Sequence, residues 1–439
     1  MSFIDPRGRR SSCVLGILVL LFAINAFAQS APSAGTRPGP VTTLRDAFTR
    51  ALEANPNLRG QRFAVSAADA RIDQAALRPS FEVGVEAENI LGTNRLSTFD
   101  DSEVTLRLGT VLELGGKRSR RIDAARTERD LILTQNDAER LDLLAEVGRR
   151  FIRMATAQEE VDLANRRLDL ADRTRKGVDQ RVSAARSPRL EGNNAAVAMN
   201  RAEIEYQQAE SALRQSWAQL SSLWGGDTFY PGRVAADLFA MPSTGNYAAL
   251  SALLERNPDI IRFASERRIQ DAKLRLAESQ RTPDVSLSAG IRRLQADRSN
   301  AFVLSASIPL GSGSRAAPYI AEAQSLRGGL QYKEQAVRAE LMATLFVALE
   351  QVSQSRQEVQ KLLTVAIPQA DEANKLALDG YNVGRFSLLE LITAQQQLTD
   401  LQRQAIDAAA AFHASLLEVE RLTGTSAADR DVSNTVGTP

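Results

Sequence analysis

The chain contains the same pattern twice, and this duplication limits what it can fold into more than any other feature. The peptide Leu52–Pro56 returns as Leu254–Pro258, 202 positions later. Each copy continues with a proline-free helical stretch, two segments of alternating polarity, a long helix, a break and a second helix. The copies also end alike, with Leu223-Trp224-Gly225 matching Leu422-Thr423-Gly424. Repeats of this kind indicate one supersecondary unit that is used twice.

The repeats set the expected domain boundaries. We expect repeat 1 over residues 42–225 and repeat 2 over 248–424, joined by an equatorial connector at 226–247 that contains Pro231 and Pro242. Residues 425–439 are expected to form a disordered tail.

Four segments alternate between apolar and polar side chains, namely 81–90, 103–114, 284–293 and 301–311. In the first of them, Phe81, Val83 and Val85 face one way and glutamates face the other. Each segment has roughly the 9–11 residues that a tilted transmembrane strand needs. The pattern therefore favours strands of a membrane β-barrel with lipid outside and water inside. A soluble hairpin with one buried face has the same period and is the alternative.

Four strands are too few to close a barrel. Open strand edges are not tolerated in lipid, where every backbone polar group needs a partner. Strands from several chains must then combine, and three chains with four strands each would give twelve, an even number of ordinary barrel size.

The helical segments are unusually long. No proline occurs from Lys117 to about Lys176, and a helix of roughly 60 residues would be about 90 Å long. The last helix carries apolar and small residues at alternating spacings of three and four: Leu391, Ala394, Leu398, Leu401, Ala405, Ala408, Phe412, Ser415, Val419 and Leu422. This period predicts antiparallel coiled-coil packing, with a plain helical bundle as the alternative. Pro368 predicts a kink in the long helix of repeat 2.

The N-terminus indicates export. Three arginines precede an apolar stretch, and Ala26-Phe27-Ala28 offers a cleavage site, so residues 1–28 are expected to be a signal peptide rather than an uncleaved anchor. Residues 29–41 are expected to be a flexible leader. Cys13, the only cysteine, lies inside the signal.

Composition excludes several classes of function. Removal of residues 1–28 leaves 51 basic and 52 acidic residues, so nothing suggests nucleic-acid binding. The lone His413 is a poor metal ligand without further donors, and Gly311-Ser312-Gly313 lacks the spacing and lysine of a phosphate loop. We therefore predict no cofactor and no enzymatic activity.

Two motifs resemble a known family. The stretch Leu112–Arg118 (LELGGKR), at the exit of the second strand, is similar to the CzcC-like heavy-metal efflux branch of the TolC family of outer membrane factors. The stretch Gly380–Gly384 (GYNVG), followed by Ser387–Leu391, is similar to the periplasmic hairpin of that family. The resemblance extends over residues 42–424.

The resemblance implies a fold and a set of partners. A trimeric twelve-stranded barrel would stand on a twelve-helix tunnel that crosses the periplasm from the bacterial outer membrane. The tip of the tunnel would meet a periplasmic adaptor, which links it to an inner-membrane pump of the RND type. The chain would be a passive exit duct, without catalysis of its own.

Particular residues follow from the resemblance. Tyr381, Glu390 and Arg385 would lie at the periplasmic aperture, with Tyr381 holding it closed and Glu390 lining it. The alternatives are a packed tyrosine at a helix end and a surface glutamate that is solvated or paired within the chain. The matching hairpin tips, where an adaptor would dock, are represented by Val383, Gly384, Ala185 and Ser187.

A basic cluster opens the first long helix, where the helix dipole disfavours positive charge. Its position below a strand predicts contact with lipid headgroups, with simple solvation as the alternative. The residues are Lys117, Arg118, Arg120 and Arg121.

The function predicted from the sequence is an outer-membrane exit duct for divalent heavy-metal cations. The alternatives are a drug or small-peptide duct of the same architecture, and a secreted coiled-coil structural protein with soluble hairpins.

Overall fold

The structure is a computed structural model that describes residues 41–90, 92–93, 99–226 and 232–424. The expected signal peptide, the leader apart from Val41, and the tail lie outside the described residues. Among the described helices, none is both long enough and apolar enough to cross a membrane.

Repeat 1 begins with a short strand and ends with a 3₁₀ turn. Its elements are β1 (Val41–Thr42), α1 (Leu44–Ala54), α2 (Pro56–Ala75), β2 (Glu82–Glu88), β3 (Glu103–Leu112), α3 (Lys117–Ser183), α4 (Arg189–Ser221) and the turn Ser222–Trp224.

Repeat 2 follows the connecting strand β4 and has the same order. The elements are β4 (Arg233–Val234), α5 (Tyr247–Leu253), a 3₁₀ turn (Leu254–Arg256), α6 (Pro258–Ser279), β5 (Val285–Leu294), β6 (Ser299–Ser307), α7 (Ser312–Lys361), a π-helical turn (Leu362–Ala366), α8 (Ile367–Asn382) and α9 (Leu388–Thr423).

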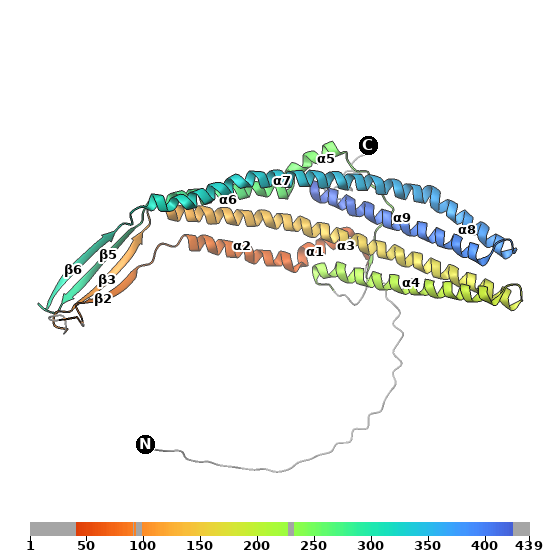
Figure 1. Cartoon of the computed structure of the whole chain (residues 1–439), viewed down its shortest axis with the longest axis horizontal. Coiled ribbons are helices and arrows are strands. Elements are labelled where there is room, and N and C mark those ends of the chain that lie inside the picture. The colour runs from red at the N-terminus through yellow and green to blue at the C-terminus, as the bar shows by residue number, and fades with distance from the viewer. Residues whose placement is uncertain (1–40, 91, 94–98, 227–231, 425–439) are drawn as a thin grey trace, which may run out of the picture. The chain divides into compact units, whose positions relative to one another are not determined.

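The four long strands form one antiparallel sheet in the order β2-β3-β5-β6 (Figure 1). The pairing of β3 with β5 joins the two repeats and places Leu106 opposite Ile291. Within the described residues, β2 and β6 each have an outer edge with no neighbouring strand. The sheet is therefore open on both sides in a single chain.

The two faces of this sheet differ in chemistry. One face carries exposed apolar side chains, with Phe302 88% and Leu304 82% exposed. On the other face, Arg292 forms ion pairs with Glu103 at 2.8 Å and with Glu88 at 2.9 Å. Arg107 lies 3.4 Å from Glu86 on the same face. Alternation along the strands thus separates an apolar face from a charged one.

The repeated Asn-Pro peptide explains how each repeat holds its helices together. Asn55 and Asn257 cap α2 and α6 through their side-chain oxygens, and proline follows at the first helical position. The amide nitrogen of Asn55 donates to the carbonyl of Leu223 at 2.8 Å, and that of Asn257 to Leu422 at 2.8 Å. Each buried amide therefore joins the start of one helix to the end of another.

The long helices agree with the absence of helix breakers, and α3 extends over 67 residues. Pro368 lies at the start of α8, directly after the π-helical turn. Proline cannot donate a backbone hydrogen bond and its ring crowds the carbonyl four residues earlier, so a widened turn accommodates it. The irregularity expected at Pro368 is thus found in the preceding turn, and the chain remains helical through it.

Replacing Asn257 with Ala should lower the free energy of unfolding by about 1–3 kcal/mol, because a buried carbonyl loses its donor and a helix loses its cap. Asn55→Ala should cost about as much for the same reason. Denaturant unfolding of the detergent-extracted protein, followed by circular dichroism, measures both. Asn246→Ala is the matched control, because Asn246 is exposed and caps α5 through a single bond to Ala249. Equal losses in all three variants would contradict the role of the buried amides.

Candidate functional site: the two helical hairpins

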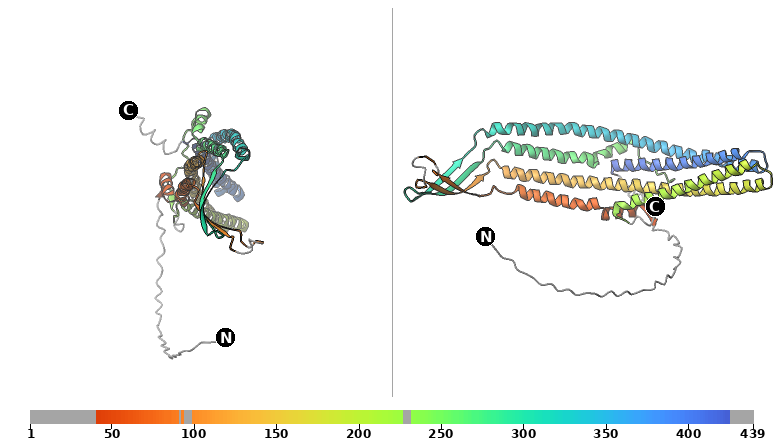
Figure 2. Two further views of the ribbon diagram at one scale, coloured as in Figure 1. Left: turned by 90° about the vertical axis from the view of Figure 1, so that its left-hand side faces the viewer. Right: turned by 60° about the horizontal axis from the view of Figure 1, so that its bottom comes forward.

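Two helical hairpins carry the residues that the sequence assigned to the aperture. One joins α3 to α4 and the other joins α8 to α9, and their tips lie side by side in both figures (Figures 1 and 2). The sheet lies at the other end of the helices (Figure 1).

The two tips have the same backbone. Ala185 has a φ of 55° and Gly384 a φ of 77°, so both turns pass through the left-handed region. In one turn the N–H of Arg186 donates to Arg181 at 2.8 Å, and in the other the N–H of Arg385 donates to Gly380 at 2.7 Å. The tips are therefore equivalent positions of the two repeats, although alanine bears a conformational cost that glycine avoids.

The form of the second turn depends on Gly380. A Cβ placed there would lie 2.1 Å from the ring of Phe386, which is far inside van der Waals contact. Phe386 therefore folds back onto the last turn of α8.

Tyr381 lies between the two hairpins rather than in open solvent. Its side chain is 5% exposed, and its hydroxyl donates to Glu191 of α4 at 3.1 Å. The Arg181 guanidinium lies 4.8 Å from the ring centre and donates to the carbonyls of Tyr381 at 3.0 Å and Asn382 at 3.1 Å. We call Arg181, Glu191 and Tyr381 the tip clasp, because they join one hairpin to the other.

The environment keeps the clasp tyrosine protonated. Burial raises the pKa of the Tyr381 hydroxyl, and the hydrogen bond to Glu191 acts in the same direction. The hydroxyl therefore remains a donor throughout the neutral range.

Arg181 and Glu191 were not identified from the sequence. They are two charged residues among many, and their partner Tyr381 is 200 and 190 positions away. Both residues lie within one to two helical turns of the break at Ser187-Pro188. Because this break corresponds to the tip that carries Tyr381 in repeat 2, charged residues beside it could have been proposed as partners of Tyr381.

Glu390 caps its own helix. Its carboxylate accepts from the N–H of Ser387 at 2.7 Å and from the Ser387 hydroxyl at 2.8 Å, which completes a capping box at the start of α9. The backbone hydrogen bond from Ser387 is the main cause that lowers the pKa of Glu390 below its ordinary value. The side chain is exposed, so the cap leaves the charge in contact with solvent.

The expected docking residues occupy exposed positions, except Ser187. Val383 is exposed, as are Gly384, Ala185 and Arg385. Ser187 is half-buried and accepts from the Arg181 Nε at 3.2 Å. Exposed Leu190 and Leu389 add further apolar surface beside the turns.

The basic cluster below β3 is largely engaged within the chain. Lys117 has a side chain only 6% exposed, with its ammonium 2.7 Å from Asp284 of repeat 2. Arg118 donates to the carbonyl of Ala76 at 2.5 Å, and Arg121 pairs with Glu113 at 3.0 Å. Arg120 is exposed, with Asp123 at 4.0 Å. The ion pair with Asp284 thus compensates for the unfavourable helix dipole at Lys117. Lipid contact remains a prediction, and it depends mainly on the exposed Arg120.

His413 has a structural environment. Its Nε2 lies 2.9 Å from the carbonyl of Leu238 in the connector, and burial lowers the pKa of the ring. Across the described part of the chain, no group of three or more His, Cys, Asp or Glu side chains is arranged to hold a metal ion.

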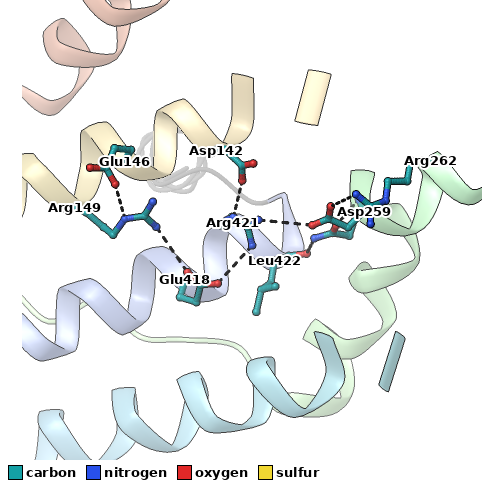
Figure 3. Close-up of polar contacts among 9 residues, drawn as sticks. Asp142, Glu146, Arg149, Asp259, Arg262, Glu418, Arg421 and Leu422 are labelled. Carbon is teal, nitrogen blue, oxygen red and sulfur yellow. Dashed lines mark hydrogen bonds and ion pairs between the residues drawn. The ribbon is translucent and has the colours of Figure 1, made fainter. Parts of the chain in front are cut away.

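A charged network fastens the hairpin helices where the repeats meet (Figure 3). Arg421 of α9 lies 2.8 Å from Asp142 of α3, 3.6 Å from Asp259 of α6 and 3.5 Å from Glu418. Burial opposes its charge, yet the hydrogen bond to Asp142 and the nearby carboxylates raise the pKa of Arg421. This one side chain therefore connects both repeats.

A sheet with one apolar and one charged face, continued by long paired helices, is an arrangement expected of an outer membrane channel protein. The description "Outer membrane efflux protein" applies to the family whose profile matches residues 47–226 and again 249–425. The chain belongs to this family of outer membrane efflux proteins. The family is one of efflux ducts rather than of enzymes.

Curated relatives are similar to this chain over most of its length. The cobalt-zinc-cadmium resistance protein CzcC of Cupriavidus metallidurans is 28% identical over 423 residues, which covers 95% of this chain and 100% of that protein. The nickel-cobalt-cadmium resistance protein NccC of Alcaligenes xylosoxydans is 26% identical and covers 72% and 70%.

Solved structures show the same fold. CusC superposes with a TM-score of 0.72 at 17% identity and covers 91% of this chain and 96% of CusC. The outer membrane protein VceC of Vibrio cholerae gives a TM-score of 0.68 at 18% identity, with 87% and 96% covered. These similarities confirm the TolC-like fold predicted from the sequence.

Tyr381→Phe should raise the open probability of the reconstituted protein, because it removes the bond to Glu191 and keeps the ring in place. A hydrogen bond to a charged group contributes about 1.5–3 kcal/mol, so a rise of about 10- to 100-fold is expected. Arg181→Ala should have a larger effect, since it removes two bonds to carbonyls and the ring contact. Single-channel recording in planar bilayers measures both, with Tyr319→Phe, an exposed tyrosine of α7, as the control. An open probability that matches wild type in both clasp variants would contradict the role of the clasp.

Proposed function

We propose that the chain is the outer-membrane duct of a tripartite efflux system that exports divalent heavy-metal cations. Three copies would close a twelve-stranded barrel, and their helices would form a tunnel across the periplasm. An adaptor would dock at the hairpin tips and connect the duct to an inner-membrane pump of the RND type.

The open sheet is the observation that carries this proposal. The outer edges of β2 and β6 leave backbone groups that must be paired if the apolar face meets lipid. Since β2 and β6 are antiparallel to their neighbours, β6 of one copy can pair with β2 of the next in the same alternating sense. The charged face with Arg107 and Arg292 would then line the water-filled interior.

The choice of metal cations is supported by the relatives. CzcC is a cobalt-zinc-cadmium resistance protein, NccC a nickel-cobalt-cadmium resistance protein, and CnrC of Cupriavidus metallidurans a nickel and cobalt resistance protein. A duct needs no metal site to serve such a pump, because passage requires only weak contacts and a favourable charge along the path.

The hairpin tips support the adaptor contact. Val383, Leu389 and Leu190 expose apolar side chains beside turns that have the same backbone in both repeats. One adaptor surface would therefore meet two similar sites on each copy of the chain.

Deletion of the gene should make the host sensitive to zinc, cobalt, cadmium and nickel salts, with resistance restored by the wild-type gene. Growth across a panel of metal salts and a second panel of detergents, dyes and antibiotics measures this. Sensitivity to amphiphilic drugs alone would overturn the metal assignment in favour of a drug duct. Recovery of the protein in the periplasmic wash as a single chain would overturn the duct itself.

Glu390→Gln should reduce the preference of the reconstituted channel for cations, because it removes a negative charge from each copy while glutamine can still fill the capping box. The reversal potential in a salt gradient measures this preference. In wild type the pKa of Glu390 is lowered, so the preference should persist on acidification and disappear only as the pH falls through that lowered value. Ser387→Ala is the control, since it weakens the cap and keeps the charge. If Ser387→Ala reduces the cation preference and Glu390→Gln leaves it unchanged, the aperture role of Glu390 is wrong.

A further inference from the structure

Strand β5 carries two consecutive arginines near its end, and their side chains lie on opposite faces of the sheet. Arg292 lies on the charged face, where it forms ion pairs with Glu88 and Glu103. Arg293 lies on the apolar face and is exposed. The proposed duct accounts for the first arginine, which would face water, and leaves the second without a role.

The register of the sheet fixes the face on which Arg293 lies. It stands opposite Val104 of β3 and Asn300 of β6, and the next row of the same face contains Ile291 and Phe302. The structure describes every residue of β2, β3, β5 and β6, and on the apolar face of these strands Arg293 is the only charged side chain. A single guanidinium thus interrupts an otherwise uncharged surface.

Arg293 lies at the end of the apolar face that is farthest from the helices (Figure 1). It follows Val285, the first residue of β5, by eight positions, which is about 26 Å along the strand at 3.3 Å per residue. The apolar band of an outer-membrane barrel is about 25 Å tall, and a lipid-facing arginine is costly at its middle but tolerated near its edges. The position of Arg293 therefore corresponds to the level at which lipid headgroups begin.

The hairpin turn between β5 and β6 holds the guanidinium of Arg293 in place. The Nη1 of Arg293 donates to the carbonyl of Arg298 at 2.6 Å and lies 3.4 Å from the Oδ1 of Asn300. Within the described part of the chain no carboxylate forms an ion pair with Arg293, whereas Arg292 has two such partners. The other N–H groups of the Arg293 guanidinium can therefore donate to a ligand.

The same turn supplies a second exposed guanidinium, that of Arg298. Arg298 has a φ of 50°, a left-handed conformation that glycine adopts freely and that costs conformational energy for arginine. The N–H of Gln295 donates to the carbonyl of Ser102 at 3.0 Å, so the turn is tied to the segment before β3. Asp297 is the one carboxylate of the turn 295–298, which leaves a net positive charge beside Arg293.

We propose that Arg293 and Arg298 bind the phosphate of a phosphorylated lipid headgroup, with the acyl chains of that lipid against Ile291 and Phe302. The proposal rests on the proposed function, in which the apolar face meets the lipid of the outer membrane. A guanidinium presents its N–H groups as a planar fork that matches the oxygens of a phosphate. The end of the sheet that lies away from the helices would bind the outer leaflet, so the lipid is of the lipid A type.

The neighbouring apolar row favours a lipid over a soluble anion. Ile291 and Phe302 are exposed directly beside the arginine, one row closer to the helices. A free phosphate would contact only the guanidinium groups, whereas a phosphorylated lipid offers an anionic group and an apolar chain at the same spacing. Contact with both would fix the height at which the sheet sits in the membrane.

Binding of fluorescent diphosphoryl lipid A to the delipidated protein in a neutral detergent tests the site. Each arginine near an anionic lipid surface contributes a factor of about five, so Arg293→Gln/Arg298→Gln should weaken binding about 25-fold. Arg173→Gln/Arg214→Gln is the matched control, because it removes two charges from exposed arginines in the α3–α4 hairpin and should bind as wild type does. Arg293→Lys/Arg298→Lys keeps the charges without the fork and should lie between the two.

The source of the phosphate is tested with two further ligands. Wild type should bind dephosphorylated lipid A as weakly as the double glutamine variant does, and inorganic phosphate should not displace the phosphorylated lipid. Displacement by inorganic phosphate would overturn the lipid in favour of a soluble anion. Equal affinity of wild type and the double glutamine variant would overturn the site.

The mass of each variant in detergent separates this site from the proposed function. A protein that is assembled from several copies, with the circular dichroism of wild type, and yet binds both forms of lipid A equally would overturn the site and leave the duct standing. A wild-type protein with the mass of a single chain would overturn the proposed function, and the lipid site with it.

Discussion

The unpaired outer edges of β2 and β6 are the constraint on which the rest of the structure depends. A strand edge carries a row of backbone donors and acceptors, and an apolar environment offers them no water. If the apolar face meets lipid, as we propose, other copies of the chain would complete its four-stranded sheet. In the proposed duct the long helices would need neighbouring copies as well, because they continue the strands. The pairing of β3 with β5 joins the two repeats within one chain, and the proposed pairing of β6 with β2 of the next copy would have the same antiparallel sense.

Contacts that the two repeats share hold the helices together, whereas side chains that differ between the repeats form the tip clasp. The buried amides of Asn55 and Asn257 are matched, and so are the backbones of the two tips. At the tips, however, the side chains differ. Glu191 and Glu390 occupy corresponding positions, yet Glu191 accepts from Tyr381 whereas Glu390 accepts only from its own helix start. The clasp therefore joins the hairpins of one chain, and among residues 41–90, 92–93, 99–226 and 232–424 it has no equivalent built from Glu390.

The sequence predicted the elements well because each rests on a local period. Alternation located the four strands, and the absence of proline located α3. Local sequence patterns did not predict which charged side chains are buried or which residues pair across long sequence distances. Lys117 was predicted to contact lipid headgroups because of its position below a strand, but its side chain is nearly buried and pairs with Asp284 of the other repeat. Arg181 and Glu191 were missed since nothing local distinguishes them from other charged residues. The capping role of Glu390 could be predicted from Ser387, three positions earlier, because a serine and a glutamate at this spacing form a capping box.

The hydrogen bonds of the tip clasp are comparable in free energy to the contacts that an adaptor would make in the proposed duct. The clasp contains a hydrogen bond from Tyr381 to a carboxylate and two from Arg181 to carbonyls, and bonds of this kind contribute about 1.5–3 kcal/mol each. Covering one exposed Val or Leu contributes roughly 1.5–3 kcal/mol as well. A partner that buries Val383, Leu389 and Leu190 would thus gain a free energy comparable to the clasp itself. In the proposed duct, an adaptor would open the tips only to the extent that it buries more of these side chains in the open form than in the closed form.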